Sequence, residues 1–176
     1  MNDIGIIVID YQSDPLLDQA LMALANSALS STFKVVVVEN RPRRIHRDIP
    51  KNIDIQFLTQ KKNLGFGRAV NLARRQLHAP YLFILNPDVQ VFQNTISILH
   101  DFMKKNSQVG LVVPKLLDPK GNVQASARKF YDLPTIFCRR SFLGKLFPDH
   151  QRLRDHIMAD WDHMTIREID WALGAC

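Results

Sequence analysis

Cysteine is scarce in this chain of 176 residues, which contains only Cys138 and Cys176. Two cysteines cannot build a disulfide framework, and their separation matches no metal-ligand spacing. The low cysteine content fits a reducing compartment, so we expect neither thiol to have a special role.

Long apolar runs and a secretory signal are also missing. The longest apolar runs, such as IGIIVI and YLFIL, fall far short of the roughly 18 residues that a membrane-spanning helix needs. The start, Met1-Asn2-Asp3, lacks the basic character of a secretory signal. We therefore expect a cytoplasmic protein, and any membrane contact to be peripheral, at the inner face of the cell membrane.

Basic residues are in excess, but no nucleic-acid-binding motif accompanies them. The net charge is +6, with lysines and arginines in small clusters. Such an excess suits a phosphate-bearing ligand, an anionic membrane or nucleic acid, and it is equally typical of a solvated surface. Because zinc-finger, RNP and helix-turn-helix patterns are absent, we expect no nucleic-acid partner.

The sequence does contain short apolar, β-branched runs that alternate with helical patterns. At 46% hydrophobic residues, it has enough apolar side chains for a full core. Continuous apolar strands separated by helices indicate an α/β fold with a parallel sheet that is buried on both faces. The predicted strands are 4–9, 34–39, 53–58, 81–85 and 109–113.

Three segments between these strands carry helical signals. Asp14-Pro15 supplies an N-cap and a proline at the first helical position, followed by apolar residues at helical spacing from Leu17 to Ala28. Val70 to Leu77 predicts a second helix, and Ile96 to Met103 a third.

The alternation of strands and helices ends after Val113. The next stretch predicts two extended segments around a turn at 118–121, because proline presets the first turn dihedral and glycine tolerates positive φ. We therefore expect a boundary near residue 115. Residues 1–115 would form a nucleotide-binding half, and residues 116–176 a second, smaller region.

Loops at the carboxyl ends of parallel strands are the usual ligand sites of such sheets. Asn86-Pro87-Asp88 follows the fourth predicted strand, and Pro87 ends the strand and directs Asp88 at its rim. Magnesium and manganese sites for nucleotides often use one or two protein carboxylates. The alternative is that Asp88 only caps the following helix.

A glycine-containing loop follows the third predicted strand. Gly65 and Gly67 match two glycines of a dinucleotide fingerprint, but Val70 stands at the third position, which argues against a dehydrogenase. Glycines let the backbone approach a flat or anionic ligand at a helix start. An ordinary strand-to-helix turn with Asn63 as its cap is an equal alternative.

Two further groups invite a functional interpretation. Glu39, at the end of the second strand, suits the N3–H donor of uracil or thymine, but a solvated strand end would look the same. Asp160-Trp161-Asp162, with His156 and His163 nearby, resembles a metal site only superficially, because its spacings match no known ligand set. We expect no metal there.

In order and spacing, these segments resemble the family 2 glycosyltransferases, most closely the rhamnosyltransferase-like branch that elongates bacterial surface polysaccharides. The matching stretches are IIVIDYQSDPLLDQAL, VVVVEN, KKNLGFGRAVNLA, LFILNPDV, VGLVVPKLLDPKGNVQASARKF, DWDH and REIDWALGAC. The resemblance implies the Rossmann-like GT-A fold, with a mostly parallel sheet flanked by helices. It also implies inverting transfer of rhamnose or a similar sugar from a TDP- or UDP-linked donor to a saccharide or lipid-linked saccharide.

The resemblance assigns roles to individual residues. Asp88 is the expected ligand of a divalent metal, magnesium or manganese, and Asn86 replaces the first aspartate of the family's Asp-x-Asp motif. The implied donor-binding residues are Asp10, Tyr11, Glu39, Asn63, Gly65, Arg68, Asn86 and Asp88. The implied acceptor-side residues are Arg128, Trp171, Gly174 and Ala175.

The family's general base is expected beyond Cys176, the last residue of this sequence. The acceptor-side region would then be incomplete, and the chain would be either part of a longer enzyme or a shortened product that binds sugar nucleotides without transfer. Residues 128–148 mix aromatic and basic side chains. They suit an anionic membrane surface or, alternatively, a helix whose aromatic side chains face the core.

Overall fold

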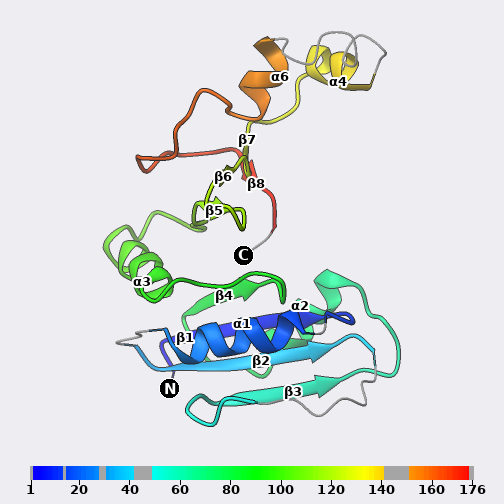
Figure 1. The fold of residues 1–176 in the computed structure, drawn as a ribbon, viewed down its shortest axis with the longest axis vertical. Helices are drawn as coiled ribbons and strands as arrows, with labels where there is room; N and C mark the ends of the chain where they lie inside the picture. Colours follow the sequence, from blue (N-terminus) through cyan, green and yellow to red (C-terminus); the bar gives the residue numbers. More distant parts are fainter. Residues whose placement is uncertain (1, 14, 28–30, 42–48, 141–150, 175–176) are drawn as a thin grey trace. The chain divides into compact units, whose positions relative to one another are not determined.

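Seven consecutive buried residues make β1 (Ile4–Asp10) a central strand of a parallel sheet. β1 pairs with β2 (Phe33–Glu39) on one side and with β4 (Tyr81–Leu85) on the other, and β3 (Ile55–Thr59) pairs with β2. All four strands point the same way in Figure 1, in the order β3-β2-β1-β4. The first, second and fourth predicted strands are confirmed, and the third begins two residues later than predicted.

This computed structural model describes residues 2–13, 15–27, 31–41, 49–140 and 151–174. The chain divides into two units. The first unit is residues 1–112 with 175–176, and the second is residues 113–174. Among the described residues, no helix is both long enough and apolar enough to cross a membrane.

Helices cover both faces of the sheet in the first unit (Figure 1). Even-numbered residues of β1 pack with α1 (Leu16–Ala25) and the start of α3 (Thr95–Lys105), and odd-numbered residues pack with α2 (Phe66–Arg74). Strand residues alternate between faces, so a continuous apolar run fills both cores. The predicted α/β fold with helices flanking a parallel sheet is confirmed.

The helix ends differ in detail from the prediction. Pro15 is the N-cap of α1, not its first helical residue. Its φ of −87° suits a residue just outside the helix. Asp14 and Ala28, the other signals for this helix, lie outside the described residues. Leu77 follows the end of α2 yet is buried in the core beneath it.

The predicted strand at 109–113 is wrong, because this segment is irregular. A strand needs a partner, and the outer edge of β4 pairs with no strand in the described part of the chain. Leu111 is 80% exposed, so the apolar run is not buried on both faces. Pro114 directly follows the run and lacks the N–H that would extend a ladder.

The second unit begins with the predicted pair of extended segments. β5 (Leu116–Leu117) and β6 (Val123–Gln124) pair antiparallel. Between them, Asp118 accepts hydrogen bonds from the backbone N–H groups of Lys120 and Asn122, both at 2.8 Å. Gly121 has a φ of 85°, which glycine adopts without strain.

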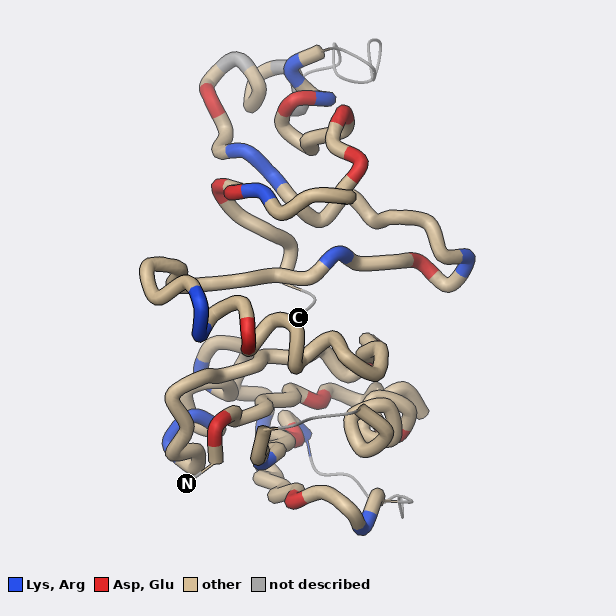
Figure 2. The backbone as a smooth tube through the Cα atoms, turned by 90° about the vertical axis from the view of Figure 1, so that its left-hand side faces the viewer, with Lys and Arg blue, Asp and Glu red and all other residues tan. Residues whose placement is uncertain are grey.

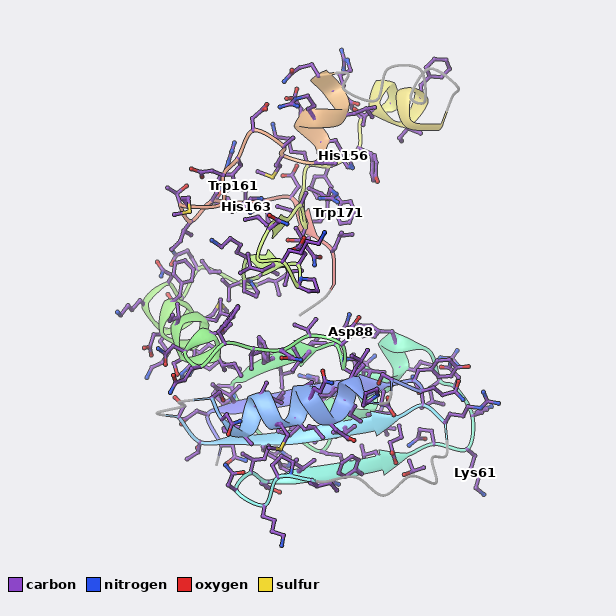
Figure 3. All side chains as sticks on the ribbon, in the orientation of Figure 1. Lys61, Asp88, His156, Trp161, His163 and Trp171 are labelled. Carbon is purple, nitrogen blue, oxygen red and sulfur yellow. The ribbon has the colours of Figure 1, made fainter. Side chains whose placement is uncertain are left out.

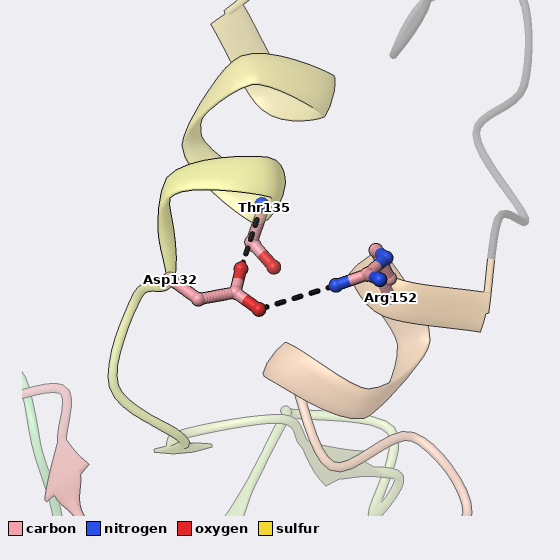
Figure 4. A network of polar contacts seen from close by, with 3 residues as sticks. All are labelled: Asp132, Thr135 and Arg152. Atoms are coloured by element: carbon pink, nitrogen blue, oxygen red, sulfur yellow. Dashed lines mark hydrogen bonds and ion pairs between the residues drawn. The ribbon is translucent and has the colours of Figure 1, made fainter.

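Two short helices of the second unit are joined through Asp132. Its carboxylate accepts from Thr135 N at 2.7 Å at the start of α4 (Leu133–Arg140), and from Arg152 of α6 (Gln151–His156) at 3.2 Å (Figure 4). The hydrogen bonds from Thr135, and then the nearby Arg152 charge, lower the pKa of Asp132. Both partners of the ion pair are half exposed, so it orders the helices more than it stabilises them.

Candidate functional site

Three polar side chains form a row at the carboxyl edge of the parallel sheet. Asp10 is the register partner of Glu39, and Glu39 is the partner of Thr59. Partner residues on neighbouring strands lie about 4.8 Å apart and point to the same face. This face is the one covered by α1, because Asp10 continues the even-numbered side of β1. The row therefore lies at the strand ends, where an α/β sheet binds its ligands.

The loop after β1 is held by Asp10, which is buried. Its Oδ1 atom accepts from Ser13 N at 3.2 Å and also from the Ser13 hydroxyl. Gln12 has a φ of 58°, a conformation that costs energy for residues other than glycine and is concentrated at functional sites. Tyr11 is 50% exposed, so its ring is available at this edge.

Glu39 is buried at the end of β2, and its carboxylate is held from the neighbouring strand. Thr59 Oγ1 donates a hydrogen bond to Glu39 Oε2 at 2.5 Å. A carboxylate offers about four lone-pair positions, so Glu39 can accept from Thr59 and from a ligand N–H at the same time.

The glycine-containing loop is tied to the end of β2 through Asn40. Asn40 is buried, and its Oδ1 accepts from Leu64 N at 3.2 Å. Asn63 Oδ1 accepts from Gly65 N at 2.7 Å. Gly65, and not Asn63, is the N-cap of α2, with a φ of 75° and no side-chain cap. The start of α2 therefore keeps backbone N–H groups uncapped by side chains at the carboxyl edge of the sheet.

The predicted metal ligand follows β4 in a turn closed by a hydrogen bond from Val89 N to Asn86 O at 3.2 Å. Asp88 is exposed, and Figure 3 shows it on the side of the sheet toward which the strands point. Gln90 Nε2 donates to Gln19 Oε1 of α1 at 3.0 Å. This bond links the turn to the helix that covers the same face as Asp10 and Glu39.

The remaining predicted donor residue, Arg68, lies in the first turn of α2 and is exposed. Lys61, at the end of β3, also extends from this side of the sheet (Figure 3). The structure thus brings all eight predicted donor-binding residues to one edge of the first unit, from four loops and strand ends.

The side chains at this edge suit a metal ion that is coordinated partly by a ligand better than a metal ion that is coordinated by protein side chains alone. The described residues contain no group of three or more histidine, cysteine, aspartate or glutamate side chains that would hold an ion. Asp88 alone offers an exposed carboxylate in the turn. Magnesium and manganese in nucleotide sites are commonly held by one or two carboxylates and completed by phosphate oxygens.

Three of the four predicted acceptor-side residues, Arg128, Trp171 and Gly174, belong to the second unit. Arg128 of β7 (Ala127–Arg128) and Trp171 of β8 (Trp171–Ala172) are register partners. Trp171 Nε1 donates to Lys129 O at 3.1 Å, and Arg128 donates to Ala127 O at 2.8 Å. Gly174 is exposed, and Ala175 lies outside the described residues.

Aromatic rings pack beside these two short strands. The rings of Tyr131 and His156 have centroids 4.1 Å apart, and those of Tyr131 and Trp171 are 6.1 Å apart. His156 is buried, whereas Tyr131 is 41% exposed. His156 thus belongs to a small aromatic core rather than to the metal-like group suggested by its position in the sequence.

The other members of that group have separate partners. The rings of Trp161 and His163 stack with centroids 4.0 Å apart (Figure 3). Asp160 pairs with Arg154 at 2.5 Å, and the hydrogen bond and charge of Arg154 lower the pKa of Asp160.

Sequence reasoning missed three residues that hold the site together: Ser13, Asn40 and Thr59. Ser13 had a weak signal, since aspartate side chains in turns commonly accept hydrogen bonds from residues shortly after them. Asn40 directly follows Glu39 at a strand end. Thr59 had no signal, because its partnership with Glu39 depends on the register of two strands that are 20 residues apart.

Comparison with known sequences identifies a family. The profile described as "Glycosyl transferase family 2" matches residues 5–173. Two curated relatives from Mycobacterium tuberculosis strains, CDC 1551 / Oshkosh and ATCC 25618 / H37Rv, are each 26% identical over 97% of this chain. Both are named N-acetylglucosaminyl-diphospho-decaprenol L-rhamnosyltransferase, and the match covers 59% of their length.

Comparison with solved structures supports the fold. S. aureus TarS is similar with a TM-score of 0.50 and 17% identity, over 65% of this chain and 24% of that chain. The structure of TarS 1-349 in complex with UDP gives 0.50 and 16% identity, over 68% and 43%. The complex with UDP-GlcNAc gives 0.50 and 16%, over 77% and 42%.

Proposed function

Because this chain belongs to glycosyl transferase family 2, we propose that it binds a nucleoside-diphosphate sugar at the carboxyl edge of its parallel sheet, for transfer of the sugar to an acceptor. The observation that carries the proposal is the gathering of Asp10, Glu39 and the Gly65 loop at one edge, where strand pairing holds the first two and side-chain hydrogen bonds of Asn40 and Asn63 hold the loop.

Each part of the edge suits one part of such a donor. The Glu39 carboxylate accepts the N3–H of a uracil or thymine ring, and Tyr11 offers an exposed ring for the nucleoside. Gly65 lets the backbone approach the ligand closely, and Arg68 contributes positive charge at the start of α2. The proposed donors are thus TDP- or UDP-linked sugars, with rhamnose or a similar sugar as the group transferred.

Asp88 and the Asn86 turn would hold a magnesium or manganese ion together with the diphosphate. When bound, such an ion neutralises the charge that develops on the leaving diphosphate. The chain's own contribution is to position the Asp88 carboxylate, because the turn and the Gln90–Gln19 bond hold the loop against α1.

The acceptor is proposed from the second unit and from the curated relatives. Their name describes transfer of L-rhamnose to N-acetylglucosaminyl-diphospho-decaprenol, which is a lipid-linked sugar. We propose a saccharide or lipid-linked saccharide acceptor near Arg128, Trp171 and Gly174, with inverting transfer. A lipid-linked acceptor would bring this chain to an anionic membrane surface, which vesicle co-sedimentation tests.

Replacing Asp88 by alanine tests the donor half of the proposal. We expect Asp88→Ala to weaken manganese-dependent UDP or TDP binding about ten- to a hundredfold, because hydrogen bonds and contacts to charged groups contribute about 1.5–3 kcal/mol. Isothermal titration with and without manganese measures the change. Urea unfolding should be unaltered, since Asp88 is exposed.

Asp101→Ala is the matched control, because Asp101 is an exposed carboxylate on α3. It should bind both nucleotides like the unaltered chain. If Asp88→Ala and Asp101→Ala bind UDP and TDP with the same affinity, Asp88 has no part in the site.

A further inference from the structure

Thr59 lies at an exposed edge of the sheet, where few side chains have a structural role. It is the last residue of β3, an edge strand, and it is exposed. It belongs to neither apolar core of the first unit. Its hydroxyl nevertheless donates to the buried Glu39 carboxylate at 2.5 Å, a short hydrogen bond.

The strand register determines the side from which Thr59 contacts Glu39. Glu39 and Thr59 are partners in parallel strands, so both side chains point to the same face and Thr59 approaches Glu39 from the β3 side. The terminal torsion of a free glutamate side chain is broad. A hydrogen bond to Oε2 therefore restricts the plane in which the carboxylate presents its other lone pairs.

The fixed carboxylate has consequences for nucleobase recognition. Uracil and thymine present an N3–H donor flanked by two carbonyl acceptors, whereas cytosine presents an N3 acceptor beside an amino donor. An ionised carboxylate only accepts hydrogen bonds. When it is held in one plane, it meets the N3–H of uracil and faces the N3 lone pair of cytosine. A carboxylate turned into another plane can instead reach the cytosine amino group.

We infer that Thr59 is a positioning residue that sets the preference of the donor site for uracil or thymine over cytosine, by holding the Glu39 carboxylate. This inference rests on the proposed function, in which Glu39 reads the base. Specificity of this kind is a difference between two affinities, so it is measured as a ratio.

Thr59→Val tests the inference, because valine keeps the shape and β-branching of threonine but removes the hydroxyl. UDP and CDP are titrated with manganese into the full chain and into Thr59→Val, Thr59→Ser and Glu39→Gln. In Thr59→Val, we expect the UDP-over-CDP affinity ratio to fall about three- to tenfold, as loss of one hydrogen bond predicts. Thr59→Ser should restore the ratio, since serine keeps the donor.

The outcomes separate the two proposals. If the unaltered chain binds neither UDP nor TDP, the proposed function fails and the inference fails with it. If the unaltered chain prefers UDP and Thr59→Val keeps the same ratio, only the inference fails. An equal loss of UDP and CDP affinity in Thr59→Val also overturns it, because a general disturbance of the edge would lower both. Glu39→Gln should lower the UDP-over-CDP affinity ratio whether or not Thr59 positions Glu39. Its ratio shows how much of the base preference depends on the Glu39 carboxylate.

Discussion

His163 is a partly buried loop residue with two notable features. Its imidazole stacks on Trp161, and its φ of 56° lies in the left-handed region. Partial burial, followed by the nearby Lys115 charge, lowers the pKa of His163 below its ordinary value of 6.5, and the Asp162 charge acts in the opposite direction. The neutral imidazole is therefore the form that suits the folded second unit.

We expect this residue to make the chain less stable as the pH falls below 6.5. A histidine whose pKa is lowered by folding binds a proton in the unfolded chain first, so the free energy of unfolding is highest above 6.5 and decreases below it. Urea unfolding at pH 7.5 and 5.5 should show a smaller loss in His163→Gln than in the unaltered chain. His78→Gln, at an exposed position, is the control. Equal losses in all three proteins would contradict the expectation.

At the same scale, the sequence indicated the residues that face a ligand better than the residues that hold them. Glu39 and Gly65 follow apolar strands, and their chemistry can be read from residue type and position. Asn40 and Thr59 act through contacts with residues 24 and 20 positions away. Such contacts depend on strand register and loop path, which local patterns do not specify.

Among the elements, β1 is closely packed by its neighbours at Gly5. A Cβ atom there would lie 2.9 Å from Leu77 Cδ1 and 3.0 Å from Leu82 Cδ2. Leu82 is its register partner on β4, and Leu77 follows α2. Glycine at this position therefore lets the segment after α2 and the edge strand approach the centre of the sheet.

Gly5→Ala should destabilise the chain by about 1–3 kcal/mol, the usual cost of adding a methyl group to a packed core. Urea unfolding followed by circular dichroism measures the change. Gly67→Ala is a matched control with the opposite expected sign. Its Cβ would meet nothing within 4 Å, and alanine is favoured over glycine in a helix by about 0.5–1 kcal/mol. A stable Gly5→Ala protein would show that both leucines move aside freely.

The elements that were predictable from sequence are those with a local cause. β1, β2 and β4 are continuous apolar runs, and the hairpin of β5 and β6 has a proline-glycine turn. Residues 109–113 are an apolar run like β4, yet a strand at an edge requires a partner, and composition does not supply one. The three predicted helices correspond to α1, α2 and α3, and their ends were less accurate because caps such as Gly65 depend on backbone conformation.

In the whole molecule, the large buried side chains belong almost entirely to the first unit, and the second unit exposes many apolar ones. Acidic and basic residues are interspersed along the second unit in Figure 2. On and beside α4, Leu133 is 82% exposed, Phe130 72% and Phe137 64%. Within this unit these side chains do not face a core, and contact with a membrane stays a prediction.

The proposed contact with an anionic membrane predicts binding to vesicles. With a net charge of +6, the chain should co-sediment with phosphatidylglycerol vesicles and much less with phosphatidylcholine vesicles, and salt should weaken the binding. Leu133→Ser with Phe137→Ser should reduce binding at least about tenfold, because two apolar side chains no longer enter the interface. Ile98→Ser, at a 65% exposed position of α3, is the control. An unaffected double variant would remove α4 from the interface.

The row of Asp10, Glu39 and Thr59 also limits where insertions and deletions can be tolerated in the evolution of this chain. Each side chain reaches the row only because its strand has an unbroken two-residue alternation from the core to the rim. Deleting a single residue inside β1, β2 or β3 would turn the terminal side chain to the opposite face, whereas the connections between the strands can change length without that effect. Insertions and deletions in related genes should therefore gather outside these three strands.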